Sequence, residues 1–196
     1  MNSDVDVCNA ALNNLGATTI SALTEDSKAA RLCNSRYTSL RDSVFRAHPW
    51  NCLITRVTLA ADSADPTFEF ANQFSLPTSP YCLRIVSLDY HDLVFRVEGR
   101  KILSDEATIN LIYVGRVTDV TQYDTLLAET LVAKLASELA YPIIGSVSLA
   151  QNMFALYEQK LKEARFIDAS EGTPASITSV TAAGSLEADT FITSRF

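Results

Sequence analysis

The chain has 196 residues, of which 47% are hydrophobic, and it carries a net charge of −7. This hydrophobic share supports a folded core and excludes disorder throughout the chain. The acidic balance argues against the basic face that grips nucleic acid, although an acidic wall would let DNA slide past without binding. The sequence also lacks an apolar run long enough to cross a membrane, and its acidic start has no hydrophobic stretch typical of a signal peptide.

Two helices are predicted in the first fifty residues, over about residues 4–15 and 26–47. Ser3 is the expected cap of the first helix, and Gly16 suits its end. Thr24 or Asp26 is the expected cap of the second helix, whose apolar stripe follows steps of three and four residues. Pro49 disfavours a helical conformation at the residue before it and ends this helix.

The character of the sequence changes between residues 54 and 117, where short apolar runs alternate with polar turns. These runs predict strands, and their spacing suggests an antiparallel meander. The expected strands are 57–59, 68–70, 83–88, 93–97 and 108–114.

Helical periodicity returns after Tyr123. A third helix is predicted over about residues 124–141, ended by Pro142, and a fourth over about 148–166, capped by Ser148 with Gln151. From residue 168 to residue 196 the sequence is rich in Ser, Thr, Ala and Gly, which is typical of an extended tail.

The resulting prediction is an α+β fold. A four-helix bundle carries an antiparallel β-meander between its second and third helices, and residues 1–167 form a single domain followed by the C-terminal tail. The residues expected in the bundle core are Leu12, Leu15, Tyr37, Leu40, Trp50, Leu131, Leu135 and Leu156.

Residues that could support catalysis or bind a metal are few and scattered. The four cysteines, at positions 8, 33, 52 and 82, form no C-x-x-C pair, so neither a zinc site nor a disulfide is expected. His48 at a helix end and His91 in a turn are better explained as structural residues than as catalytic bases. The carboxylate pairs Asp105–Glu106 and Asp62–Asp65 fall in predicted surface turns. We therefore predict no catalytic site, no metal and no cofactor.

Partner contacts are expected at the two ends of the chain. Arginine is favoured in bidentate interface pairs with carboxylates, and the second helix carries several. The last six residues hold apolar side chains that a mere linker would not need, so the tail is interpreted as a docking segment. The predicted partner-binding residues are Phe191, Ile192, Arg195, Phe196, Arg31 and Arg41.

Two stretches in the first sixty residues are distinctive. The first is Ala10-Ala11-Leu12-Asn13-Asn14-Leu15-Gly16, and the second is Arg41-Asp42-Ser43-Val44-Phe45-Arg46-Ala47-His48-Pro49-Trp50. With the strand-like run that follows them, they resemble the head-to-tail adaptors of short-tailed phages, the tail tubular protein A family. The resemblance covers most of the chain in element order and is densest in these sixty residues.

The resemblance implies a structural virion protein in the neck of the tail. Such a protein forms a homo-oligomeric ring, usually of twelve copies, between the portal protein and the tail nozzle, or second tubular protein. The ring extends the DNA channel without specific DNA binding and gives a platform for the tail and its fibres. On this basis the tail segment is expected to bind the portal or the adjacent copy. The alternative is a phage-associated hydrolase acting on host surface polysaccharide, although no motif for that activity is present.

Overall fold

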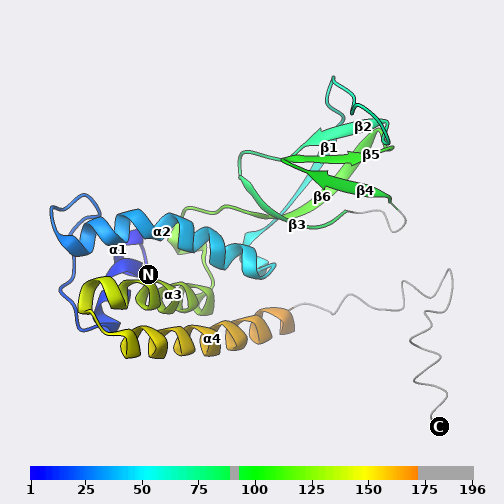
Figure 1. The fold of residues 1–196 in the computed structure, drawn as a ribbon. Coiled ribbons are helices and arrows are strands. Elements are labelled where there is room, and N and C mark those ends of the chain that lie inside the picture. The colour runs from blue at the N-terminus through cyan, green and yellow to red at the C-terminus, as the bar shows by residue number, and fades with distance from the viewer. Residues whose placement is uncertain (89–92, 172–196) are drawn as a thin grey trace, which may run out of the picture.

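The computed structural model describes residues 1–88 and 93–171. This part of the chain is α+β, with four helices and two small antiparallel sheets of three strands each. The helices lie side by side in one region, and the sheets project from one end of it (Figure 1). We call these parts the helical region (α1–α4) and the β-region (residues 54–115).

The first two helices have the caps and ends that short-range chemistry dictates. Helix α1 spans Asp4–Asn14, and its cap is Ser3, whose hydroxyl accepts from the Asp6 amide at 3.1 Å. Gly16 follows it at φ +66°, a conformation that favours glycine. Helix α2 spans Lys28–Ala47 and is capped by Ser27, not by Thr24 or Asp26 as predicted. The Ser27 hydroxyl is the one that lies within reach of the Ala30 amide.

The last two helices are longer than predicted. Helix α3 spans Thr125–Ile144 and continues past Pro142 to Gly145, which takes a left-handed conformation. Pro142 has no amide hydrogen to donate to the Glu138 carbonyl, and the helix ends within one turn after it. Helix α4 spans Val147–Ser170 and is capped by Ser146, not by Ser148. Residues 168–170, assigned to the tail from the sequence, therefore belong to a helix.

Helix α3 lies at the centre of the helical region and contacts the other three helices. Its central residues, including Leu131 and Leu135, are fully buried in one large hydrophobic cluster. The predicted core residues Leu12, Leu15, Tyr37, Leu40 and Trp50 are also buried in it. Leu156 is only partly buried and is not part of that cluster, because α4 lies on the outside and buries only Ala164 and Asp168.

The β-region contains two sheets and not one meander. One sheet has the order β1-β6-β3, formed by Ile54–Ala60, Thr108–Gly115 and Cys82–Leu88. The other has the order β2-β5-β4, formed by Asn72–Ser75, Lys101–Ser104 and Phe95–Glu98. Among the described strands, only β4 and β5 are neighbours both in sequence and in a sheet, and β6 lies between β1 and β3.

The strand expected at residues 68–70 is absent from its predicted place. Phe68 is 77% exposed and Glu69 has a φ of +76°, which a β-strand does not allow. The strand lies further on, at Asn72–Ser75, where Phe74 is fully buried and anchors a mostly polar segment. The predicted strand over 108–114 is confirmed, and its odd-numbered residues Ile109, Leu111 and Tyr113 fill a second, smaller core.

Candidate functional site

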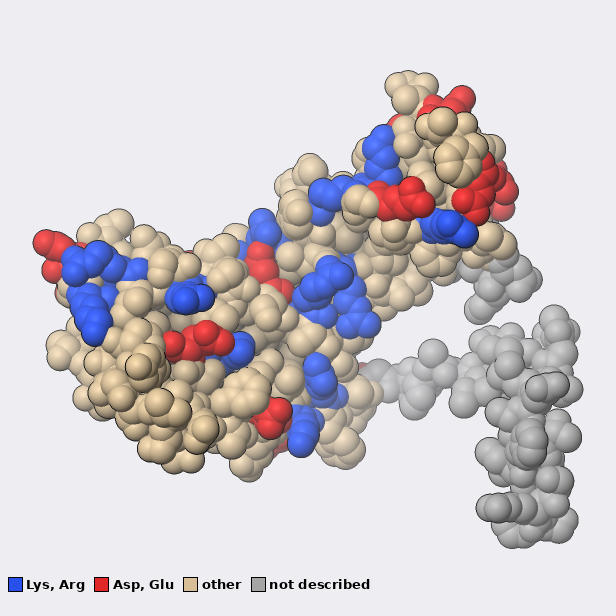
Figure 2. Space-filling view, in the orientation of Figure 1, with Lys and Arg blue, Asp and Glu red and all other residues tan. Residues whose placement is uncertain are grey.

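A groove lined by three arginines lies where the β-region meets the end of α2. Its volume is about 300 Å³. Arg46 comes from α2, Arg84 from β3, and Arg100 from the turn between β4 and β5. Figure 2 shows Lys and Arg side chains gathered at this junction. We call this site the arginine groove, and its apolar wall includes Leu76, Ile85 and Val97.

Hydrogen bonds to backbone carbonyls hold the three guanidinium groups in place. Arg46 donates to the Leu83 carbonyl, and Arg84 donates to the Arg46 carbonyl at 3.4 Å. Arg100 donates to the carbonyls of Pro77 at 2.9 Å and Cys82 at 3.3 Å. Each guanidinium has five N–H donors, so donors remain for a further acceptor.

The positive charge of the groove is not neutralised by the described residues. The ion pairs of residues 1–88 and 93–171 include none formed by Arg46, Arg84 or Arg100. Arg116, next to the groove, does have a carboxylate partner, Asp42, at 2.5 Å. The guanidiniums of Arg100 and Arg116 also lie 3.9 and 4.4 Å from the centre of the Tyr81 ring. This stacking on an aromatic ring fixes their positions.

The described lining of the groove is better suited to binding a ligand than to catalysing a reaction. Its lining contains no carboxylate and no histidine among the described residues, and its single thiol, Cys82, is buried. Burial raises the pKa of the Cys82 thiol, although the nearby charges of Arg100 and Arg46 partly offset this effect. A buried neutral thiol is a poor nucleophile. Three guanidiniums beside an apolar wall are instead suited to a carboxylate or phosphate with apolar neighbours.

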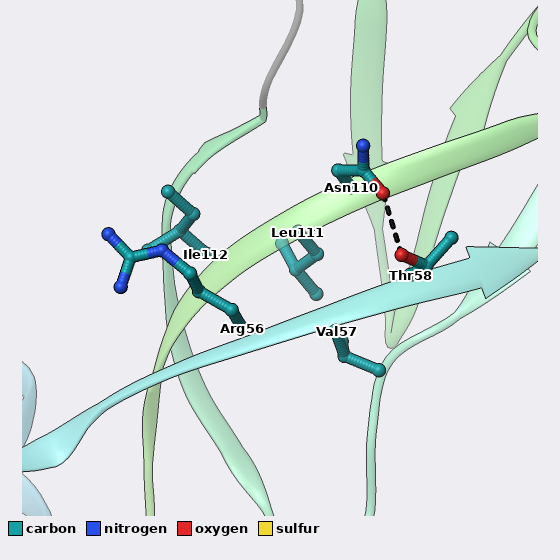
Figure 3. A pocket seen from close by; sticks show the side chains of 6 residues that line it. All are labelled: Arg56, Val57, Thr58, Asn110, Leu111 and Ile112. Atoms are coloured by element: carbon teal, nitrogen blue, oxygen red, sulfur yellow. Dashed lines mark hydrogen bonds between the residues drawn. The ribbon is translucent and has the colours of Figure 1, made fainter.

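A second cavity, of about 290 Å³, lies on the β1–β6 pair (Figure 3). Arg56 and Ile112 lie at one end of it, and Thr58 and Asn110 at the other. The hydroxyl of Thr58 and the amide oxygen of Asn110 are 2.7 Å apart. None of its six described lining residues is an acid, a histidine or a cysteine, so it offers no acid–base pair.

Two of the four carboxylates that the hydrolase alternative would use, Asp62 and Asp105, have structural partners. Asp62 accepts from the hydroxyl and amide of Ser75 and pairs with Lys101 at 3.2 Å. Burial alone would raise the pKa of Asp62, but Ser75 and Lys101 lower it below the ordinary value. A general acid needs a raised pKa instead. Asp105 accepts from the amide of Ala71 at 2.8 Å.

The structure places the predicted site residues in three different situations. Arg31 is on the surface and pairs with Asp26. Arg41 is only 4% exposed and pairs with Asp42 at 3.1 Å, so the free subunit does not offer its guanidinium to a partner. The remaining residues lie outside the described part of the chain: Phe191, Ile192, Arg195 and Phe196, together with His91.

His48 contacts a carboxylate that the sequence did not indicate as its partner. His48 Nε2 lies 3.0 Å from Asp168 Oδ2, near the end of α4. The other oxygen of Asp168 accepts from the Asn51 amide at 3.0 Å, and Arg165 donates to the Ala47 carbonyl at 2.8 Å. These bonds attach the end of α4 to the end of α2, two residues from Arg46. We call this cluster the α2–α4 lock.

The three groove arginines escaped the sequence analysis because they lie far apart in the chain. Arg46 is one of the several arginines of α2, but Arg84 and Arg100 follow no spacing that a motif would show. Only the pairing of β3 with β6 and the turn after β4 bring them together.

The described residues bring no three His, Cys, Asp or Glu side chains together in a way that would hold a metal ion. None of the four described helices has the length and hydrophobicity that a membrane span requires. No model of a known protein family matches the chain, and no curated protein matches it either.

Proposed function

We propose that this chain is a structural subunit of a phage head-to-tail adaptor. Copies of it form a ring, of twelve by the family resemblance, between the portal protein and the tail nozzle. The ring extends the DNA channel without specific binding and supports the tail and its fibres. On this proposal the protein acts in the virion neck and has no enzymatic activity.

The observation that carries the proposal is the amount of apolar surface on a folded subunit. Many large hydrophobic side chains of the described residues are exposed in both regions, which is typical of a surface that another subunit covers. In the helical region they are Tyr141, Ile144, Val147, Phe154, Phe166 and Ile167, and in the β-region Phe68, Val86, Val94, Phe95 and Val97.

The stretch that resembles the adaptor family forms a defined local structure. After α2 ends at Ala47, Pro49 turns the chain and Trp50 is fully buried beneath the helix end. The Trp50 indole donates to the Val44 carbonyl at 3.1 Å. The His-Pro-Trp sequence therefore directs the chain from α2 into β1, which gives the shared element order a physical reason.

Assembly with a portal ring tests the proposal. The purified chain is mixed with the portal protein encoded in the same genome, and particles are imaged by electron microscopy. We expect a ring of copies stacked on the portal, and no such ring when residues 186–196 are deleted. A chain that never joins the portal, but hydrolyses host polysaccharide through one essential carboxylate, would replace the proposal with the hydrolase alternative.

A further inference from the structure

The arginine groove needs a ligand that is both acidic and apolar. Its three arginines have no carboxylate partner among the described residues, while Leu76, Ile85 and Val97 form an apolar wall. The chain as a whole is acidic, at −7, so bulk attraction to nucleic acid is weak. A peptide with carboxylates next to apolar side chains fits this chemistry better than a phosphate backbone does.

The groove also borders a strand that can accept a partner strand. Among the strands of residues 1–88 and 93–171, β4 lies at the edge of its sheet and pairs with β5 on one side only. All four of its residues, Phe95–Glu98, are exposed, and Val97 lines the groove. An exposed edge strand is a template for an added strand, whose backbone then gives affinity while alternate side chains give specificity. On the other side, the carbonyls of Cys82 and Leu83 on β3 are already taken by Arg100 and Arg46.

The chain itself contains a segment with the required chemistry. Residues 186–192 read Leu-Glu-Ala-Asp-Thr-Phe-Ile. In an extended peptide, Glu187 and Asp189 would share one face at about 6.7 Å from each other, which suits two separate guanidiniums. Leu186, Phe191 and Ile192 provide the apolar side chains on either side of these acids.

The α2–α4 lock holds the end of α4, and so it fixes the position from which the chain continues toward this segment. Asp168 is bound to His48 and Asn51, so the chain beyond Glu171 starts close to the groove end of α2. About sixteen residues separate Glu171 from Glu187, enough to reach roughly 50 Å when extended. Phe166 and Ile167, 74% and 41% exposed in the last turns of α4, are apolar surface of the kind that a second subunit covers.

We propose that the arginine groove of one subunit binds the acidic segment 186–192 of a neighbouring copy, as a strand beside β4. This inference rests on the proposed ring, in which every subunit has a neighbouring copy. Binding of the segment to its neighbour would link successive subunits around the ring. Because every subunit supplies one groove and one segment, the contact is head-to-tail, the type that forms a ring when the rotation between neighbours closes.

Photo-crosslinking of the full chain tests this contact. Benzoylphenylalanine replaces Ala188 in an unlabelled copy, which is mixed with a ¹⁵N-labelled wild-type copy, alone and on portal. We expect cross-links from position 188 to labelled peptides holding β4 or residues 83–85. Cross-links found only within the unlabelled copy would show that the segment binds its own groove, and cross-links to other surfaces would exclude the groove. Either result overturns the proposal.

Charge reversal provides the specificity test. The variant R46E/R84E should lower the cross-link yield about tenfold, the effect of losing roughly 1.4 kcal/mol. The segment variant E187R/D189R should do the same, and mixing the two variants should restore the yield. The matched control is Arg36→Glu, an exposed residue of α2 that does not line the groove, and its yield should stay unchanged. Because E187R/D189R alters no described residue, its effect cannot be attributed to damage of the described fold.

The outcomes separate this inference from the proposed function. If the chain assembles on portal but position 188 never reaches the groove, the groove assignment fails and the adaptor function stands. If the cross-link forms between copies but no ring joins the portal, the contact stands and the adaptor function fails. A cross-link yield that is unchanged by both charge reversals would refute the electrostatic basis of the contact.

Discussion

The helical region and the β-region of this protein have cores of very different size. The helical core contains twenty-six buried residues, all but Val114 of β6 from the four helices and their connections, whereas the β-region core contains six. Each helix is held by local backbone hydrogen bonds, and α3 and α4 are joined by a short connection, while the sheets depend on strands distant in sequence. A domain with a small core is marginally stable, so the helical region should be the stable foundation and the β-region the part that opens first.

The largest effect is expected from a cavity in the helical core. Leu131→Ala, at a fully buried position in α3, should lower the free energy of unfolding by about 2–5 kcal/mol. Leu156→Ala on the outer helix α4 is the matched control and should cost much less, because Leu156 is only partly buried. Thermal melts of both variants check this difference. Equal losses would mean that α4 packs as tightly as α3.

A cavity in the β-region core should have a smaller and more local effect. Ile102→Ala, at a fully buried position in β5, should cost about 2 kcal/mol, at the low end for such a change. Hydrogen exchange should speed up in the strands and leave α3 protected. If exchange accelerates equally in both regions, the two cores unfold as one unit and the comparison is wrong.

Loss of the α2–α4 lock should come next in magnitude. Asp168→Ala leaves the Asn51 amide and the His48 ring without their acceptor, which should cost about 1–3 kcal/mol. Exchange should accelerate mainly in the last turns of α4. Asp26→Ala is the control, because that carboxylate is 98% exposed. If α4 stays protected to Ser170 in the Asp168 variant, other contacts attach the helix.

High pH should destabilise the helical region through its buried tyrosines. Burial raises the pKa of Tyr123 to about 12. Burial and a hydrogen bond to Asp4 also raise the pKa of Tyr37. Because the folded state holds these protons more tightly, their stabilising effect is complete below about pH 10 and is lost as pH rises toward 12.

Absorbance at 295 nm and circular dichroism, followed together, measure this loss. These tyrosines should ionise only as the helices unfold, and Tyr37→Phe should reduce the alkaline loss of stability. Ionisation of all seven tyrosines near pH 10 with intact helices would contradict the assignment.

The smallest expected effect is that of reductant and chelator. The cysteines at 8, 33, 52 and 82 are free thiols in the structure. Intact-mass analysis should show four thiols without reductant, and a chelator should leave the melting temperature unchanged. A mass lower by about two units would indicate a disulfide, for which Cys8 and Cys33 are the first candidates because their thiols interact.

The difference between the regions also explains what the sequence could predict. The helices are encoded by local features, such as the stripe that includes Tyr37 and Leu40 and the stop at Pro49, and their positions were predicted within a few residues. The two-sheet arrangement was not predictable in this way, because the pairing of β6 between β1 and β3 depends on tertiary packing. The end of α4 was missed for a related reason: Asp168 looks like a loop residue until His48 and Asn51 are seen beside it.

The candidate site could not be predicted from the sequence either, because it also depends on tertiary packing. The arginine groove takes residues from α2, β3 and the turn after β4, and no short pattern connects Arg46, Arg84 and Arg100. The opposite holds for segment 186–192. Its acidic and apolar residues are visible in the sequence, but the segment lies outside the described residues.

Because the chain enters and leaves the β-region at neighbouring points, this region can be replaced as a unit. The first residue of β1, Ile54, is paired with Val114 near the end of β6, so the outward and returning chains are neighbours at the boundary. Such partners lie only about 5 Å apart, a gap that a two-residue turn can close. Replacing residues 55–113 by such a turn should leave the helical melt close to that of the intact chain. Other sheets could be inserted at the same two points, so one helical platform could present different surfaces without being redesigned.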